Sequence, residues 1–256
     1  MAESLSFDRV AQVYDETRGG LVRGRRMARD VAAHLTPGTT LEIGIGTGAV
    51  ALGLTELGHQ VVGVDVAPAM LSQAYQRLGP RVAIGDATAL PVGDGTVANA
   101  VFVHVLHLVG DMSAAIAEAA RVLRPGGRLV ALHGTPQLAS DELSTVTAPL
   151  ERLRQQRVDT PAQVRQAAAD AGLQYVHSGP STPGVLTETP AALADKFEQR
   201  IFSWMWRIDD VTWQREVGPV AAALRAMPDP DRPRKQTHQV WVSVCEKPFT
   251  GNPRTL

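Results

Sequence analysis

The sequence is poor in cysteine and in long apolar runs, and each shortage excludes a class of protein. Cys245 is the only cysteine, so no disulfide can form within the chain, and zinc sites built from several thiolates are excluded. No apolar run approaches the roughly 20 residues that a membrane-spanning helix needs. The first residues lack the basic and apolar regions of a signal peptide. We therefore expect a cytoplasmic protein without membrane insertion.

Net charge is also nearly absent. The chain has 25 basic and 26 acidic residues, which gives a formal net charge of -1. Without a positive field over the whole molecule, we expect no nucleic-acid partner. Asp, Asn and His are not spaced as ligands of a metal would be, so no metal is expected. The length of 256 residues and the hydrophobic share of 44% suit one large domain, or a domain with an inserted cap.

Short apolar runs alternate with helical segments over the first half of the chain. This alternation predicts an α/β fold with a doubly wound, mainly parallel, Rossmann-like sheet. Continuously apolar strands are typical of a sheet that helices cover on both faces. We expect seven strands, at residues 39–45, 60–65, 81–87, 96–109, 128–133, 173–179 and 237–248.

The sequence divides into three expected parts. Residues 1–35 read as an N-terminal helical segment, broken near Gly19-Gly20. Residues 36–185 and 237–248 are expected to form the α/β core. Residues 186–236 are expected to form a helical cap, with two helices over 186–227.

Residues 197–213 hold three of the four tryptophans. Large aromatic side chains serve lids, cores and interfaces alike, so the sequence leaves open which of the three this segment is. If it is a lid, Phe202, Trp206 and Arg207 are candidate substrate-binding residues. Residues 138–153 and the N-terminal helix are two further candidate covers.

A glycine-rich loop follows the first predicted strand. Gly44, Gly46 and Gly48 allow a tight turn and a close approach of a ligand to the backbone. The spacing also fits the dinucleotide pattern G-x-G-x-x-G/A, so the loop alone does not choose a ligand.

Three carboxylates decide whether this loop binds a dinucleotide or S-adenosylmethionine. Glu42, Asp65 and Asp86 lie at the carboxyl ends of the first three predicted strands, where ligands bind in such sheets. Acidic surroundings would repel the pyrophosphate of a dinucleotide. They favour S-adenosylmethionine, which carries an ammonium and a sulfonium.

The chain resembles the class I S-adenosylmethionine-dependent methyltransferases of the small-molecule kind, as found among ubiquinone, menaquinone and natural-product enzymes. The matching segments run in the family's order through the first half of the chain. They are "FDRVAQVYDETRG" (7–19), "LEIGIGTG" (41–48), "VVGVDVAPAML" (61–71), "GDATALP" (85–91), "VFVHVLHLVGD" (101–111) and "RVLRPGGRLVAL" (121–132). The resemblance implies an antiparallel last strand.

The resemblance also implies roles for individual residues. Glu42 and the glycine loop would hold the methionine part of S-adenosylmethionine, and Asp65 would bind the ribose. Asp86 and Ala87 would bracket the adenine, with Val66 packing on it. The remaining implied positions are Tyr14 near the cofactor, Arg18 in a common "YDxxR" position that we assign to the substrate, and Val103 and His104 near the sulfonium.

One position departs from the family pattern. Asn99 stands where the family often has an aspartate in the fourth strand. That aspartate is usually structural, so we expect the change to leave the chemistry intact. The chain also lacks the N/D-P-P-Y/F motif of many enzymes that methylate nucleic acids or protein amides, which makes a small-molecule acceptor the expectation.

Methyl transfer is an in-line displacement, and holding the reacting atoms collinear supplies much of the catalysis. A base is needed only where the nucleophile keeps its proton. His107 and His133 are the candidate catalytic bases, with His104 also near. A nicotinamide-dependent oxidoreductase and a non-methylating protein on the same fold, such as a cyclase or a binding module, are the alternative functions. The chain could form a homodimer under any of these functions.

Overall fold

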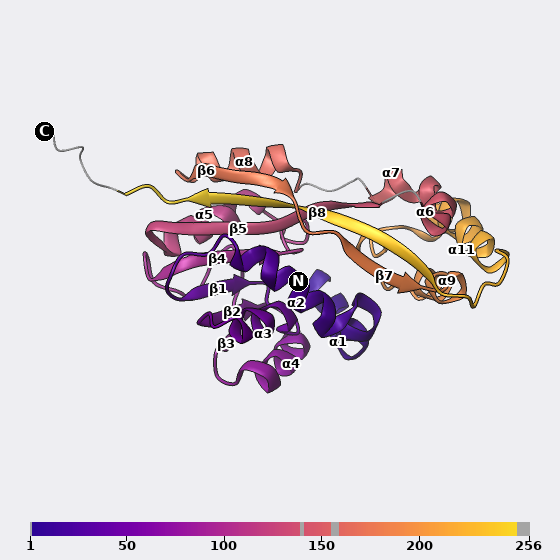
Figure 1. Ribbon diagram of the computed structural model, residues 1–256, viewed down its shortest axis with the longest axis horizontal. Coiled ribbons are helices and arrows are strands. Elements are labelled where there is room, and N and C mark those ends of the chain that lie inside the picture. The colour runs from indigo at the N-terminus through magenta and orange to yellow at the C-terminus, as the bar shows by residue number, and fades with distance from the viewer. Residues whose placement is uncertain (1, 139–140, 155–158, 250–256) are drawn as a thin grey trace, which may run out of the picture.

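The computed structural model describes residues 2–138, 141–154 and 159–249, and its centre is a mixed sheet. The sheet has eight strands, and seven of them follow the order β3-β2-β1-β4-β5-β8-β6 (Figure 1). The remaining strand, β7, pairs with the start of β8, ahead of the stretch of β8 that pairs with β6. Strands β1 to β5 are parallel, and β8 is antiparallel to β5, β6 and β7. The strands are β1 Thr40–Ile43, β2 Val61–Asp65, β3 Val82–Ile84, β4 Val97–Val103, β5 Leu123–Leu138, β6 Gln174–Pro180, β7 Gly184–Glu188 and β8 Arg234–Glu246.

The predicted fold class is confirmed, including the antiparallel last strand. The structure adds one strand to the expected seven. Residues of β7 were expected to open the cap, but they pair with the first half of β8. Their pairing partner lies some fifty residues away in the sequence, and a local sequence pattern cannot predict pairing over that distance.

Helices cover both faces of the sheet (Figure 1). One apolar cluster packs α5 and α8 on one face, with Ile116 and Val164 fully buried, and another packs α2, α3 and α4 on the opposite face. The doubly wound arrangement therefore follows from the apolar strands, which need cover on both sides. These helices and the N-terminal one are α1 Ala2–Arg18, α2 Gly20–Ala32, α3 Ala49–Glu56, α4 Pro68–Leu78, α5 Met112–Val122 and α8 Pro161–Asp170.

The break predicted in the N-terminal helical segment is present. Gly19 has a left-handed backbone with φ of 84°, and α2 begins directly after it. The expected structural role of Asn99 also agrees with its surroundings. Asn99 is buried, accepts a hydrogen bond from the Thr36 amide at 2.9 Å, and donates to the Thr36 carbonyl at 2.9 Å.

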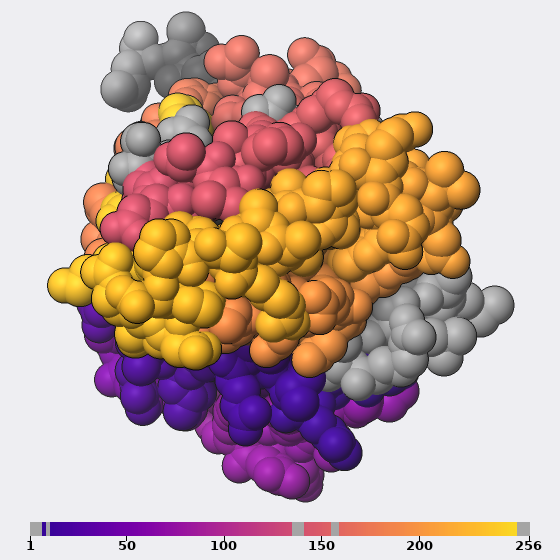
Figure 2. All heavy atoms as spheres, turned by 90° about the vertical axis from the view of Figure 1, so that its right-hand side faces the viewer, coloured from indigo at the N-terminus to yellow at the C-terminus, as the bar shows by residue number. Residues whose placement is uncertain are grey.

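A third apolar cluster forms the cap at the far end of β5 and β8. It joins residues 141–154 to residues 190–225, with Leu143, Phe197 and Met205 among its buried members. Figure 2 views the molecule from this end, where the cap elements and β8 lie above the N-terminal segment. The cap elements are α6 Glu142–Thr147, η1 Ala148–Leu150, α7 Glu151–Arg154, α9 Pro190–Glu198, η2 Ser203–Met205, α10 Asp210–Thr212, the π-helix η3 Trp213–Val217 and α11 Gly218–Arg225.

The prediction of two continuous helices over residues 186–227 was wrong. Thr189 caps α9, which ends at Glu198, and Arg200 then takes a left-handed backbone with φ of 50°. The aromatic residues that follow sit on short turns, and Asp209 caps a new helix. Caps and turns interrupt an apolar pattern that looks helical when read for hydrophobicity alone.

None of the helices in the described ranges is long and apolar enough to cross a lipid bilayer.

Candidate functional site

The glycine loop runs between β1 and α3 in a conformation that favours glycine. Gly44, Gly46 and Gly48 have φ of 73°, 56° and 76°. A Cβ atom on Gly44 would collide with the side chain of Val105, whereas Gly46 faces open space. Side chains other than hydrogen are therefore strained at these positions, and the exposed backbone of the loop can meet a ligand.

Glu42, the acidic residue of β1, is buried beside this loop. Its side chain is 2% exposed, and its Oε2 atom has no hydrogen-bond partner among the described residues. Burial, with the charge of Asp65 nearby, raises the pKa of Glu42 to about 8. A buried carboxyl group with an unused oxygen is suited to a cationic ligand, which would restore the ionised form.

The next two strand ends present the other predicted carboxylates. Asp65 accepts hydrogen bonds from the amides of Gly46 at 2.7 Å and Ala67 at 2.9 Å, which tie β2 to the glycine loop. Asp86 is exposed and accepts from the Thr88 amide and hydroxyl, both at 2.8 Å; these bonds lower the pKa of Asp86. The structure thus places the three carboxylates at successive strand ends, along one edge of the sheet.

Between these carboxylates lie two small apolar residues. Val66 is 47% exposed, although valine usually lies inside, and Ala87 is buried. An exposed valine offers an apolar surface that a planar ring could cover. Both residues lie where the sequence places the adenine.

Two hollows meet over the carboxyl ends of the strands. We call the first the glycine-loop cleft; it is lined by Tyr14, Asp15, Arg18, Gly20, Arg23, Gly24, Met27, Glu42, Gly44, Ile45, Gly46, Thr47, Ala49, Val50, Val103 and His104. We call the second the cap cavity. Its volume is about 390 Å³, and it lies under the cap against α1.

The cap cavity takes its walls from all three covers considered in the sequence. Helix α1 supplies the residues up to Arg18, η1 supplies Leu150, and the aromatic segment supplies Phe202 and Trp204. The full lining is Phe7, Tyr14, Glu16, Thr17, Arg18, Gly19, Arg23, His104, His107, Leu108, Thr147, Leu150, Arg154, Leu186, Thr187, Glu188, Leu193, Lys196, Phe197, Phe202, Ser203, Trp204, Gln236 and His238. Four residues line both hollows, namely Tyr14, Arg18, Arg23 and His104.

His104 stands at this junction in a strained conformation. It follows the last residue of β4, Val103, and has a φ of 58°. Non-glycine residues rarely adopt this region, and such strain gathers at ligand sites where the surrounding fold enforces it. The His104 amide donates to the Leu132 carbonyl at 2.9 Å, so β5 helps to hold the turn.

The two candidate bases differ in position. His107 lines the cap cavity, and its Nδ1 atom lies 3.6 Å from Oδ2 of the buried residue Asp159. His133 is 0% exposed and is absent from the lining of both hollows. Its ring nitrogens lie 2.7 Å from the Asp159 carbonyl and 2.8 Å from the Ser243 hydroxyl, so the structure places it within the packed sheet.

The remaining predicted substrate residues also separate. Phe202 lines the cap cavity, but Trp206 packs edge-on against Phe7, with ring centroids 4.8 Å apart, and lies outside the lining. Arg207 is exposed and likewise outside it. The short turn of η2, Ser203–Met205, separates Phe202 from the other two residues.

Two residues of the site do not follow from the sequence patterns, namely Asp159 behind His107 and Arg23 in the wall shared by the two hollows. Asp159 directly precedes Thr160, the residue that caps α8, and its carboxylate accepts from the Gly134 amide at 3.1 Å. Arg23 belongs to an arginine-rich stretch of the N-terminal helical segment, a pattern typical of a solvated helix face. Its spacing of five residues from Arg18, across the predicted Gly19-Gly20 break, was the one signal that could have brought it to the site.

Comparison with known proteins agrees with this geometry. A methyltransferase domain family matches residues 41–131. The demethylmenaquinone methyltransferase of Mycolicibacterium gilvum is 33% identical over 223 residues, covering 84% of this chain and 90% of the relative. That of Thermus thermophilus is 37% identical over 142 residues, which are 51% of this chain and 64% of the relative's length.

Solved structures share the fold at lower identity. The [4+2]-cyclase SpnF has a TM-score of 0.60 at 18% identity and covers 96% of this chain and 95% of its own. Phosphoethanolamine N-methyltransferase 2 of Haemonchus contortus, in complex with S-adenosyl-L-methionine, has a TM-score of 0.55 at 19% identity and covers 94% of this chain and 57% of its own. The chain belongs to the class I S-adenosylmethionine-dependent methyltransferases of the small-molecule kind, whose cofactor is S-adenosylmethionine.

Proposed function

We propose that this chain transfers a methyl group from S-adenosylmethionine to a small apolar or aromatic acceptor bound in the cap cavity. The observation that carries the proposal is the junction of the two hollows at Tyr14, Arg18, Arg23 and His104. An in-line displacement needs the nucleophile and the methyl donor side by side and aligned. A cavity of about 390 Å³ with aromatic walls is of the size and kind that holds a small molecule.

The residues of the glycine-loop cleft, together with those at the ends of β2 and β3, which lie outside the lining of the cleft, fit the cofactor. Glu42, with its unused buried oxygen, would face the ammonium of the methionine part. Asp65 keeps lone pairs for the ribose hydroxyls, and Asp86 for the adenine amine, since each carboxylate oxygen accepts more than one bond. Val66 and Ala87 would enclose the adenine ring. When bound, S-adenosylmethionine supplies an electrophilic methyl group on its sulfonium.

His107 is the proposed base for an acceptor that must lose a proton. It lies on the wall of the cap cavity, and the carboxylate of Asp159 stands behind it. A buried carboxylate stabilises the imidazolium that forms when histidine takes the proton, as in hydrolase triads. Asp159 would then act as a positioning residue, and His133 as part of the packed sheet that fixes Asp159.

The test is labelled-methyl transfer with purified protein. The acceptors are a reduced short-chain demethylmenaquinone, chosen from the names of the relatives, and a fractionated metabolite extract. His107→Gln should lower kcat by about 10²- to 10⁴-fold and leave the affinity for S-adenosylhomocysteine within twofold. His59→Gln, outside the lining of both hollows, is the matched control.

Two results would count against the proposal at different levels. If the protein binds S-adenosylmethionine and no acceptor or extract fraction is labelled, methyl transfer fails and the cyclase or binding alternative takes its place. If label is transferred but His107→Gln equals the wild type, only the base is wrong.

We also propose a cytoplasmic location and consider a homodimer. Cys245 is a buried free thiol, and burial raises its pKa to about 11, so a reducing compartment is compatible with it. Cell fractionation tests the location, and sedimentation of the purified protein tests the dimer.

A further inference from the structure

Two arginines stand in the wall that the two hollows share, and neither has a carboxylate partner among the described residues. Arg18 donates from Nη2 to the Ile201 carbonyl at 2.8 Å. Its guanidinium lies 5.6 Å from the ring centroid of Tyr14 and 5.0 Å from that of Phe202. Its Nε atom is buried and has no hydrogen-bond partner in the described ranges. Part of the donor capacity of this cation is therefore unused.

Arg23 lies in a similar environment. Desolvation lowers its pKa to about 10, and the nearby charges of Arg18 and Arg26 act in the same direction. The side chain of Tyr14 forms a hydrogen bond with Arg23. Arg25, by contrast, pairs with Glu56 at 2.7 Å on the surface. Arg18 and Arg23 are both half-buried, and partial removal of two neighbouring cations from water without an anion is unfavourable. The arrangement therefore calls for an anion from outside the chain.

The acidic residues of the cap cavity do not provide that anion. Glu188 is in an ion pair with Lys196, and Glu16 is exposed. Glu42, in the adjoining cleft, has its pKa raised to about 8 and is mostly protonated at neutral pH. The shared wall is therefore positively charged although the chain as a whole has a formal net charge of -1.

We propose that the acceptor carries an anionic oxygen group, such as a carboxylate, and that Arg18 binds it with Arg23 at its side. The inference rests on the proposed function, because it takes the cap cavity as the acceptor site. The carboxylate of the cofactor can neutralise one of the two arginines. Arg18 is assigned to the acceptor because it contacts Ile201 and Phe202 of the cap, whereas no such contact of Arg23 is found within the described part of the chain.

The assignment is tested by calorimetric titration of the S-adenosylhomocysteine complex, in which the cofactor site is already filled. The probes are 2-naphthoate, its neutral isostere 2-naphthamide, and 2-naphthyl phosphate, which reports whether a larger anion is accepted. The wild type should bind at least one of the anions about tenfold or more tightly than the amide, because hydrogen bonds to charged groups are the stronger ones.

Arg18→Met should abolish this preference, and Arg18→Lys, which keeps the charge, should restore part of it. Arg29→Met removes one exposed arginine from α2 and is the control, expected to match the wild type. Circular dichroism and S-adenosylhomocysteine affinity confirm that each variant is folded.

Three outcomes would overturn the inference. They are equal or absent binding of all three probes, an anion preference that survives in Arg18→Met, and competition between the anion and S-adenosylhomocysteine, which would assign both arginines to the cofactor. Failure of the wild type to bind S-adenosylhomocysteine would instead refute the proposed function, so the two failures are distinguishable.

Discussion

At the scale of single residues, Glu42 couples burial to ligand choice. Its carboxyl group is out of water, and one oxygen lacks a partner in the described part of the chain. The uncharged form is favoured until a cation arrives, which is the reverse of what a phosphate-binding loop needs. Sequence reasoning from three acidic strand ends could reach this preference, because acidic side chains next to a glycine loop are visible without coordinates.

We expect the affinity for S-adenosylmethionine to depend on pH through Glu42. Its pKa of about 8 in the free protein should fall when the cationic cofactor binds, so binding releases a proton. The dissociation constant should therefore decrease as pH rises from 6 toward 8 and level off above about 8. Calorimetry in buffers of different ionisation heat measures both the affinity and the proton released.

Glu42→Gln keeps the shape of the side chain and removes its titration. This variant should bind the cofactor more weakly at pH 8 and lose the slope between pH 6 and 8. A slope that persists in Glu42→Gln would assign the proton to another group.

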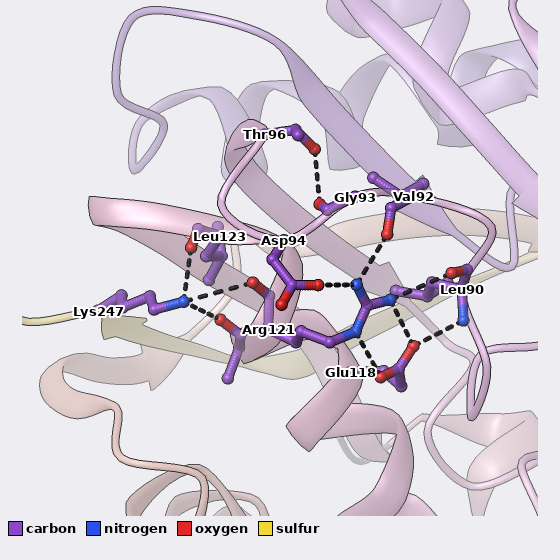
Figure 3. Close-up of polar contacts among 10 residues, drawn as sticks. Leu90, Val92, Gly93, Asp94, Thr96, Glu118, Arg121, Leu123 and Lys247 are labelled. Carbon is purple, nitrogen blue, oxygen red and sulfur yellow. Dashed lines mark hydrogen bonds and ion pairs between the residues drawn. The ribbon is translucent and has the colours of Figure 1, made fainter.

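At the scale of elements, one arginine holds the loop that follows the predicted adenine site. Arg121 of α5 donates to the carbonyls of Leu90 at 3.1 Å and Val92 at 2.8 Å, and pairs with Glu118 and Asp94 (Figure 3). Glu118 in turn accepts from the Leu90 amide at 2.8 Å. This network fixes the segment that follows Asp86. A helix on one face of the sheet therefore holds in place the loop that carries the proposed adenine-binding carboxylate.

Arg121→Met should lower the free energy of unfolding by about 1–3 kcal/mol, because the Leu90 and Val92 carbonyls lose their partners. It should also weaken S-adenosylhomocysteine binding, since the loop bearing Asp86 is released. Asp94→Asn is the control, because Asp94 is 80% exposed and its ion pair contributes little. Chemical denaturation and calorimetry measure both effects. Equal losses in the two variants would contradict the role given to Arg121.

How far the sequence predicts an element depends on where its contacts lie. The strands of the core are short apolar runs between turn residues, and the sequence pattern locates them. The cap is different, because β7 depends on a distant partner and the capping residues Thr189 and Asp209 begin new helices on either side of the aromatic turn. His107 could be named from sequence, but Asp159 behind it comes from a loop fifty-two residues later and could not.

At the scale of the whole molecule, the site lies between two bodies of apolar packing. The sheet clusters support the glycine loop, and the cap cluster supports the far wall of the cap cavity. The long strands β5 and β8 join them (Figure 1). The proposed cofactor and acceptor sites are thus supported by different cores, and we expect damage to one core to leave the other site functional.

Met205→Ala tests this separation, because Met205 is 0% exposed within the cap cluster. The cavity it leaves should destabilise the cap by about 2–5 kcal/mol and speed amide hydrogen exchange in α6, α9 and α11. The affinity for S-adenosylhomocysteine should stay within about threefold. Ile116→Ala, at an equally buried residue of α5, is the matched control and should speed exchange in the sheet core instead. Faster exchange in β1 to β4 of Met205→Ala, together with lost cofactor affinity, would mean that the two cores unfold as one unit.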